Sequence, residues 1–437
     1  MKWKSFLLIF AIFILSIFAI ISIPKLPLFQ ENQKTKIQDQ HEEPEVKEAG
    51  NVAALQEEKN DKKEETVEEK AARIVDDMSL GEKVGQLLMV GFKSTEKDEE
   101  ITDLIVNKHI GSVILFDRNM ETPEQVAQLN NSLQRLALKK RFGVPLMIGV
   151  DQEGGDILRM REKVSPIPSQ QKLGQAANEK AVYDIALLNG RELAAMGFHL
   201  NFAPVLDLSE TDSRSFGTNP EAVYTYGAKV VQGLHEAKIT ATLKHFPGNG
   251  RSSVDPHIDT SSVKADKLDL ENSDIYPFKK LIENTDHNQF FIMMTHIKYP
   301  SYDPSKPASL SSVMIQKLLR EKLGYKGIVV TDDLEMGAVN KYYSYEDMAI
   351  EAINAGADLL LVCHEYEHQV EVYNGLVKAV KDGKIQEKRI NEAVTRVLIH
   401  KLSTIQNPIV DPQYAKETVG SKEHKTLIEN WMNTKEQ

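Results

Sequence analysis

The chain has 437 residues, of which 41% are hydrophobic and 27% are charged, a composition typical of a folded globular protein. Its formal net charge of -11 argues against nucleic acid as a partner, since phosphate-binding surfaces are rich in lysine and arginine. The single cysteine, Cys363, has no second thiol to pair with inside the chain, so the fold has to rest on its hydrophobic core.

The N-terminus carries the first structural signal, an apolar run from Phe6 to Ile23 that follows Lys2 and Lys4. The run is close to the roughly 20 residues that span a bilayer. The leading lysines favour a cytoplasmic N-terminus with the rest of the chain outside. No small-residue cleavage site stands out, so we expect an uncleaved anchor over residues 1–23 and an extracellular body at the cell membrane. A cleaved signal peptide, giving a secreted protein, is the alternative.

Residues 24–68 differ sharply in composition from the run before them. Glutamate, lysine, glutamine and aspartate dominate, and large apolar side chains are few. Such a segment cannot bury enough surface to offset its ordering entropy. We interpret it as an acidic flexible linker that holds the body away from the membrane.

The pattern changes at about residue 71, where short apolar runs begin to alternate with amphipathic stretches. Two of those stretches, Pro123–Leu138 and Glu179–Met196, predict helices, and Thr122 before Pro123 is a good helix start. Eight short runs predict strands: 85–90, 111–116, 144–150, 202–206, 241–245, 290–294, 327–330 and 357–362.

Eight strands alternating with helices predict a single (β/α)8 barrel of the TIM type over residues 69–405. A doubly wound open sheet is the alternative fold. The stretch after the barrel, residues 406–437, is polar and is expected to be a C-terminal tail.

Polar side chains collect where the predicted strands end. In a barrel these carboxyl ends meet at one face, which is where active sites of this fold form. Any one aspartate or histidine there could be a helix cap or a core residue, but five strand ends carrying such groups favour a common site. They are Asp151 to Arg159, Asp207 to Gly217, Lys244 to Gly250, Thr295-His296 and Thr331-Asp332-Asp333.

These groups suit cleavage of a glycosidic bond, which passes through an oxocarbenium-like transition state. A retaining enzyme needs a nucleophilic carboxylate beneath the anomeric carbon. Asp332 is the candidate, because it directly follows the apolar strand 327–330. Asp333 would point elsewhere and could cap the next helix, and a cap is also the alternative role for Asp332.

The candidate proton donor is His257, two residues after Asp255 in a loop with several glycines and serines. This spacing lets the carboxylate reach the imidazole, which would fix its tautomer and raise its basicity. An imidazole with a pKa near 6.5 can give and take a proton at neutral pH. A surface loop with incidental polar residues is the alternative interpretation.

Four further side chains could bind a polar ligand at the strand ends. Arg159, Arg214 and Lys244 are hydrogen-bond donors only, so they suit sugar hydroxyls, and one of them could take an anionic substituent. Asp151 suits a pair of hydroxyls.

Together these motifs resemble glycoside hydrolase family 3, in the branch of β-N-acetylhexosaminidases that act on cell-wall fragments. The resemblance covers about residues 71–402. Its strongest part is Lys244-His245-Phe246-Pro247-Gly248-Asn249-Gly250, followed by Asp255-Pro256-His257. Also similar are Asp151-Gln152-Glu153-Gly154-Gly155 with Arg159, Asn201 to Asp207, and Thr331 to Met336.

The resemblance implies a barrel, a retaining double displacement, and neither metal nor cofactor. It makes Asp332 the nucleophile and the Asp255–His257 pair the acid/base unit, and it places five residues around the terminal N-acetylglucosamine. These are Asp151, Arg159, Arg214, Lys244 and His245. The chain departs from the family in Pro256, where serine or threonine is usual, which could stiffen the loop. We also expect no counterpart of the second domain seen in some relatives.

The partner expected from these motifs is a glycan, with peptidoglycan fragments as substrate and a monomeric enzyme. Chitin-derived oligosaccharides and a phosphorylase that transfers the sugar to phosphate remain as alternatives. A metal-dependent barrel hydrolase would use His245 and His296, but the first strand end, Met89 to Phe92, lacks the histidines that such a site needs. A non-catalytic sugar-binding protein would be expected to have lost Asp332 or His257.

Overall fold

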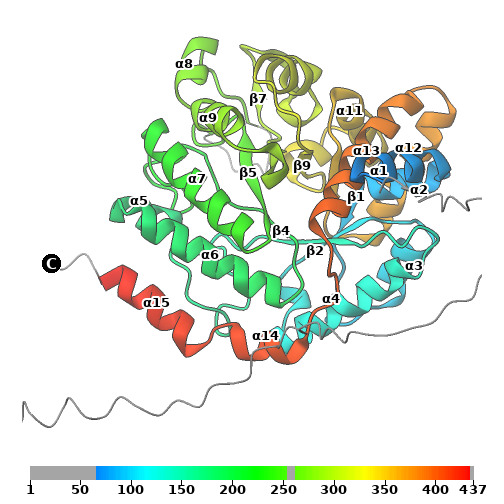
Figure 1. Cartoon of the computed structure of the whole chain (residues 1–437). Helices are drawn as coiled ribbons and strands as arrows, with labels where there is room; N and C mark the ends of the chain where they lie inside the picture. Colours follow the sequence, from blue (N-terminus) through cyan, green and yellow to red (C-terminus); the bar gives the residue numbers. More distant parts are fainter. Residues whose placement is uncertain (1–64, 253–260, 434–437) are drawn as a thin grey trace, which may run out of the picture. The chain divides into compact units, whose positions relative to one another are not determined.

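The computed structural model describes residues 65–252 and 261–433 (Figure 1). The expected anchor over residues 1–23, nearly all of the linker 24–68, and the Asp255–His257 pair lie outside the described residues. In the two described ranges, no helix combines the length and the apolar character needed to cross a bilayer.

Eight parallel strands close into a barrel in the order β1-β10-β9-β6-β5-β4-β3-β2 (Figure 1). The predicted TIM-type barrel is therefore confirmed, and the open doubly wound sheet is wrong. The strands are β1 Leu88–Val90, β2 Ser112–Leu115, β3 Met147–Val150, β4 Leu200–Asn201, β5 Thr240–Phe246, β6 Phe290–Met294, β9 Val329–Asp333 and β10 Leu359–Val362.

The fourth strand differs from its prediction. The apolar run 202–206 was expected to pair, but β4 covers only Leu200–Asn201. Pro204 interrupts the ladder because proline has no backbone N–H to donate. Beyond it, a single bridge joins Val205 to Lys244. The chain nevertheless stays between its neighbours, since the N–H of Phe202 donates to the carbonyl of Val150 over 2.9 Å.

Helices surround the barrel, and most begin with a side-chain cap. Thr66 and Glu69 form a capping box, so the first helix begins at Val67, two residues before the expected domain boundary. The helices through the first half are α1 Val67–Asp77, α2 Leu80–Gln86, α3 Glu99–Val106, α4 Pro123–Leu138, α5 Gln170–Ala176, α6 Glu179–Ala195 and α7 Pro220–Glu236. Both helices singled out in the sequence, α4 and α6, are present.

The second half of the chain adds shorter helices and one small antiparallel sheet that the sequence did not predict. The sheet pairs β7 Lys298–Tyr299 with β8 Asp303–Pro307, and a π-helical segment over Val313–Lys322 follows it. The helices are α8 Lys267–Asn272, α9 Tyr276–Asn284, α10 Gly337–Asn340, α11 Tyr345–Ala355, α12 Tyr366–Lys381, α13 Glu387–Thr404, α14 Pro412–Thr418 and α15 Lys422–Asn433.

The expected polar tail, residues 406–437, thus contains two helices in its described part. It is polar in composition, but Ala415, Val419 and Ile428 are buried. Helix α14 packs against α4 and α6, and α15 packs against α6. Three well-spaced apolar residues are enough to dock these helices, and so sparse a pattern is hard to distinguish from a solvated tail.

The hydrophobic core forms two layers, as strand alternation requires. In β1, Leu88 and Val90 face the helices, whereas Met89 points into the barrel. The barrel interior is filled by side chains such as Ile114, Phe202 and Phe291 rather than forming a channel. The polar groups at the strand ends therefore lie directly above a packed hydrophobic core.

Candidate active site

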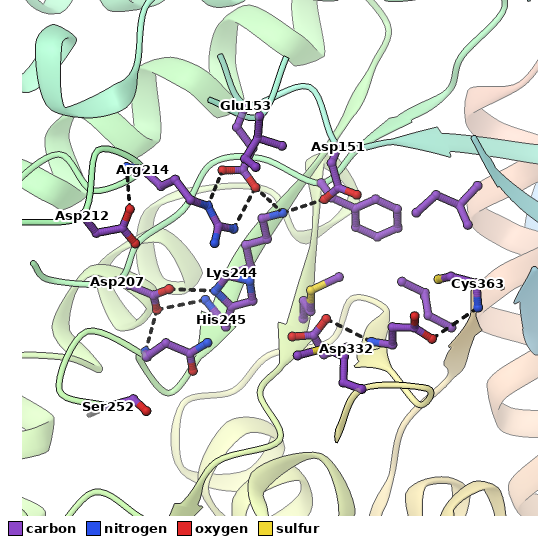
Figure 2. Close-up of a pocket in the computed structure, with 18 of the residues that line it drawn as sticks. Asp151, Glu153, Asp207, Asp212, Arg214, Lys244, His245, Ser252, Asp332 and Cys363 are labelled. Carbon is purple, nitrogen blue, oxygen red and sulfur yellow. Dashed lines mark hydrogen bonds and ion pairs between the residues drawn. The ribbon is translucent and has the colours of Figure 1, made fainter. Parts of the chain in front are cut away.

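An open cavity of about 710 Å³ lies over the carboxyl ends of the barrel strands. All six described residues that the sequence analysis assigned to the site line it, namely Asp151, Arg159, Arg214, Lys244, His245 and Asp332. Figure 2 shows five of them, all except Arg159, by label. They come from four different strand ends, which the barrel brings together from positions up to 181 residues apart (332 − 151).

Asp332 lies within β9, one residue before its end. Its Oδ1 accepts the backbone N–H of Asp333 at 2.9 Å, and no ion pair to it is found among the described residues. Burial alone would raise the pKa of this carboxyl. The imidazoles of His245 and His296 and the N–H of Asp333 outweigh burial, so the pKa of Asp332 lies below its usual range. Asp332 is therefore an anion at neutral pH with an oxygen available to a ligand.

Lys244 is the centre of a buried ion-pair network (Figure 2). Its Nζ lies 2.7 Å from Oδ1 of Asp151 and 2.7 Å from Oε1 of Glu153. Glu153 also binds Arg214 through two parallel hydrogen bonds, which Arg214 donates from Nε over 2.8 Å and from Nη2 over 2.9 Å. Such a paired geometry fixes the guanidinium plane as well as its charge.

The charges in this network stabilise one another. Burial alone would raise the pKa of Glu153, but Lys244 and Arg214 lower it to about 2. Burial would likewise lower the pKa of Lys244, yet Asp151 and Glu153 raise it above its usual value. Both groups therefore stay charged at neutral pH, and Lys244 and Arg214 are held at the cavity wall with defined orientation.

Arg159 approaches the cavity from the loop after β3. Its Nη2 lies 3.8 Å from Oδ2 of Asp151, and its Nη1 lies 3.2 Å from Oδ2 of Asp117. Its guanidinium also lies 5.5 Å from the ring centroid of Phe116, within the range of a cation–π contact. Arg159 is thus held from three sides while remaining in contact with the cavity.

His245 is paired with Asp207, a residue that follows the fourth strand. Nδ1 of His245 donates to Oδ2 of Asp207 over 2.7 Å, while Oδ1 accepts the N–H groups of His245 and Asn249. Burial would raise the pKa of Asp207, but His245 and these N–H groups lower it. Because Nδ1 carries the proton, Nε2 is the ring nitrogen left for a ligand.

The sequence did not assign Glu153 or Asp207 to the site, although both stand inside the motifs that carried the resemblance. Each acts through a neighbour, Glu153 through Lys244 and Arg214, and Asp207 through His245. Both are acidic residues in the same motifs as the predicted site residues, and that position is the sequence signal that could have identified them.

The sequence analysis also did not assign His364 to the site, although this residue forms part of the cavity wall. His364, just after β10, places Nε2 at 3.2 Å from Oδ2 of Asp333. Nη1 of Arg118 lies 3.2 Å from Nδ1 of His364, so Nδ1 of His364 accepts and its Nε2 donates. Asp333 in turn accepts the N–H of Glu335 at 3.1 Å. It does not cap the next helix as expected, because α10 follows Met336 and has no side-chain hydrogen bond at its N-terminus.

His296 does not line the cavity. It is fully buried, with Nδ1 at 2.7 Å from Oγ of Ser309 and Nε2 at 2.9 Å from the carbonyl of Asp333. Burial lowers the pKa of His296, and its hydrogen bond to the carbonyl of Asp333 makes it a structural residue that supports the end of β9. Across residues 65–252 and 261–433, no three histidine, cysteine, aspartate or glutamate side chains come together as a metal site would require.

The predicted acid/base pair, Asp255 and His257, cannot be placed, because it lies outside the described residues. The described residues just before it, Asn249, Gly250 and Ser252, line the cavity. Gly250 lies so close to the backbone of Leu208 that a Cβ there would stand 1.8 Å from its carbonyl oxygen. Glycine is therefore required where the chain passes the fourth strand end.

Comparisons with known proteins agree with this geometry. Residues 79–399 match the glycosyl hydrolase family 3 N-terminal domain. A beta-hexosaminidase of Idiomarina loihiensis is 34% identical over 315 residues, covering 70% of this chain and 91% of that protein. Beta-hexosaminidase A of Pseudoalteromonas piscicida is 28% identical over 393 residues, or 80% of this chain, and the match spans only 65% of that longer protein.

A solved structure has the same architecture. It is a glycoside hydrolase family 3 beta-N-acetylglucosaminidase from Paenibacillus sp. str. FPU-7, with a TM-score of 0.73 and 36% sequence identity. The likeness covers 81% of this chain and 68% of that one. With the barrel, the strand-end carboxylate and the family match in agreement, the chain belongs to glycoside hydrolase family 3 and is a glycoside hydrolase.

Proposed function

We propose that the protein is a retaining β-N-acetylhexosaminidase that removes terminal β-linked N-acetylglucosamine from peptidoglycan fragments. The observation that carries this proposal is the environment of Asp332, a partly buried anion at a strand end without an ion-pair partner among the described residues. The other carboxylates around it are engaged, since Asp151 and Glu153 bind Lys244 and Asp207 binds His245. The names of the relatives support the choice of sugar.

In the first step of the proposed reaction, an oxygen of Asp332 attacks the anomeric carbon and forms a glycosyl ester. The bond from that carbon to the leaving oxygen breaks, and the leaving oxygen takes a proton from His257. In the second step His257 accepts a proton from water. That water attacks the anomeric carbon, the ester bond breaks, and the sugar leaves with its original configuration while Asp332 becomes an anion again.

Lys244, Arg159 and Arg214 would act by holding the sugar in place. Their charges point into a cavity whose walls supply both donors and the acceptor oxygens of Asp151. Since each cation is already oriented by a carboxylate, binding costs little further ordering of side chains. His245, with Nδ1 bonded to Asp207, would offer Nε2 to a hydroxyl.

The setting of the enzyme is part of the same proposal. An anchor over residues 1–23 and the acidic linker 24–68 would place a monomeric catalytic domain outside the cell, close to the wall polymer. This location supports peptidoglycan fragments over chitin-derived ones, and hydrolysis over phosphorolysis, because a sugar phosphate made outside would be lost to the cell.

The test is hydrolysis of 4-nitrophenyl N-acetyl-β-glucosaminide by the purified full-length chain, beside Asp332→Asn and His257→Ala. We expect an active wild type and an inactive Asp332→Asn. We expect His257→Ala to regain turnover on a substrate with a better leaving group, since such a group needs no proton. An inactive wild type, or full activity in Asp332→Asn, would overturn the proposal.

Two further experiments identify the natural substrate and the molecule, water or phosphate, that accepts the sugar. A disaccharide of N-acetylglucosamine linked to N-acetylmuramic acid is compared with N,N′-diacetylchitobiose, and we expect the muramic acid substrate to have the higher kcat/KM. Product analysis in phosphate buffer should give free sugar only. Sugar phosphate as the main product would make the protein a phosphorylase.

A further inference from the structure

The C-terminal segment, residues 406–433, reaches the loop that carries Asp151 and Arg159. We name residues 151–169, between β3 and α5, the substrate loop. The two meet at Glu192, a carboxylate on α6 that is only 2% exposed. Glu192 lies outside the cavity, and the proposed reaction does not use it.

Glu192 accepts hydrogen bonds from both partners at once. From the substrate loop, Ser165 donates its hydroxyl to Oε1 over 2.5 Å and its N–H to Oε2 over 3.1 Å. From the C-terminal segment, the N–H of Gly420 donates to Oε1 over 2.9 Å, and Nδ1 of His424 lies 2.8 Å from the same oxygen. An ionised carboxylate only accepts, so Nδ1 of His424 is the donor.

Packing brings the same two parts of the chain together. Val164 and Val419 are both buried next to this junction. A Cβ on Gly420 would lie 2.1 Å from the carbonyl oxygen of Lys163, and Gly420 has a φ of +62°. Only glycine fits both the close approach and the backbone conformation, so this contact depends on the residue in the C-terminal segment.

The substrate loop transmits this anchoring to Arg159 over a few residues. The N–H of Val164 donates to the carbonyl of Met160 over 3.2 Å, which closes a turn directly after Arg159. Arg159 itself donates its N–H to the side chain of Gln152 over 2.7 Å. Asn189, one turn before Glu192 on α6, donates to the carbonyl of Gln152 over 2.9 Å. Helix α6 thus fixes the loop at two points, and the C-terminal segment completes the second one.

We propose that Glu192 and His424 are positioning residues, through which the C-terminal segment holds the substrate loop so that Arg159 faces the sugar. The proposal rests on the proposed function, since sugar hydrolysis reports the position of Arg159. Loss of the anchor weakens binding of substrate and transition state alike, because Arg159 contacts the sugar before and during the reaction. Such a loss raises KM and leaves kcat nearly unchanged.

The test compares His424→Ala with His424→Asn in the full-length chain. Alanine removes a hydrogen bond to a charged group, and we expect KM to rise roughly three- to tenfold with kcat within about twofold. Asparagine keeps a side-chain N–H close to the position of Nδ1, so we expect KM to return most of the way to the wild-type value. A wild-type KM in His424→Ala would overturn the proposal.

The matched control is Asn131→Ala. Asn131 on α4 makes two hydrogen bonds to Val410, at 2.8 Å and 2.9 Å, so it anchors the same segment but not the substrate loop. We expect lower stability with KM unchanged. An equal rise of KM in Asn131→Ala would mean that any loosening of the segment acts in the same way, and would contradict a specific role of His424.

A second readout needs no activity. Hydrogen–deuterium exchange of peptides spanning residues 160–168 should become faster in His424→Ala and not in Asn131→Ala, and unchanged exchange would refute the anchoring. If the wild type fails to hydrolyse the sugar but this difference appears, the proposed function fails and the anchoring stands. Should His424→Ala not fold, Ser165→Ala removes the hydroxyl bond from the loop side and is expected to give the same two effects.

Discussion

Replacing Glu153 with glutamine tests whether the ion-pair network around Lys244 is as strong as its geometry indicates. The change keeps the shape of the side chain and removes its charge. Lys244 would then keep its ion pair with Asp151, whereas Arg214 would lose its ion pair with Glu153, and both cations would remain largely buried. We expect a less stable protein with a higher KM, because two cations at the cavity wall lose the partner that orients them.

The magnitude follows from the pKa of Glu153, which falls from 4.5 to about 2 in the folded protein. This difference corresponds to about 3 kcal/mol of unfolding free energy at neutral pH. Because the folded pKa is the lower one, the contribution is fully present above pH 4.5. It is lost as the pH falls from 4.5 towards 2, where the folded carboxylate also takes up a proton.

The assay is urea unfolding of wild type and Glu153→Gln at pH 7 and near pH 3. We expect a gap of about 3 kcal/mol that shrinks to about 1 kcal/mol at the lower pH. The matched control is Asp117→Asn, since Asp117 pairs with Arg159 at 3.2 Å but is 61% exposed, and it should cost less than about 1 kcal/mol. The network would not be stabilising as inferred if the difference in unfolding free energy did not change with pH, or if it equalled the difference found for Asp117→Asn.

Two other predictions concern a buried lysine away from the cavity and a buried thiol, Cys363, at the cavity wall. Burial lowers the pKa of Lys401 to about 7. Between pH 7 and 10 the unfolded chain therefore binds a proton that the folded protein does not bind. The free energy of unfolding should rise with pH in this range, by up to about 1.4 kcal/mol per pH unit. Lys401→Met should lack this rise between pH 7 and 9 in urea unfolding, and equal slopes would contradict it. Burial raises the pKa of the Cys363 thiol, so iodoacetamide at pH 8 should label the unfolded protein and spare the native one. Rapid labelling of native protein, read by mass spectrometry, would show that the thiol is accessible.

Much of the barrel could be predicted from the sequence because buried parallel strands are continuous apolar runs. Seven of the eight runs overlap the observed strands directly. The exception was 202–206, where Pro204 breaks the ladder and pairing falls on the preceding Leu200–Asn201. Apolar character predicts that a residue is buried, whereas strand pairing also needs backbone N–H donors. A proline can be buried but has no N–H, so an apolar run that contains one need not pair as a strand.

The site was predictable to the extent that its groups directly follow strands. Asp332, Asp151 and Lys244 are placed by the barrel itself, so sequence position was enough. Glu153 and His364 depend on how a loop folds back, and periodicity carries no information about that. The docking of the C-terminal segment on Glu192 was unpredictable for the same reason, since it joins parts of the chain 228 residues apart through single hydrogen bonds.

The proposed mechanism requires a covalent bond between Asp332 and the sugar, and this bond can be trapped. The full-length chain is incubated with a fluorinated N-acetylglucosaminide bearing a good leaving group, which slows breakdown of the glycosyl ester, and is then examined by intact-mass and peptide mass spectrometry. We predict one added sugar per chain on the peptide that contains Asp332, and none in Asp332→Asn. A label on another residue, or turnover of the wild type with no label at any time, would contradict the account.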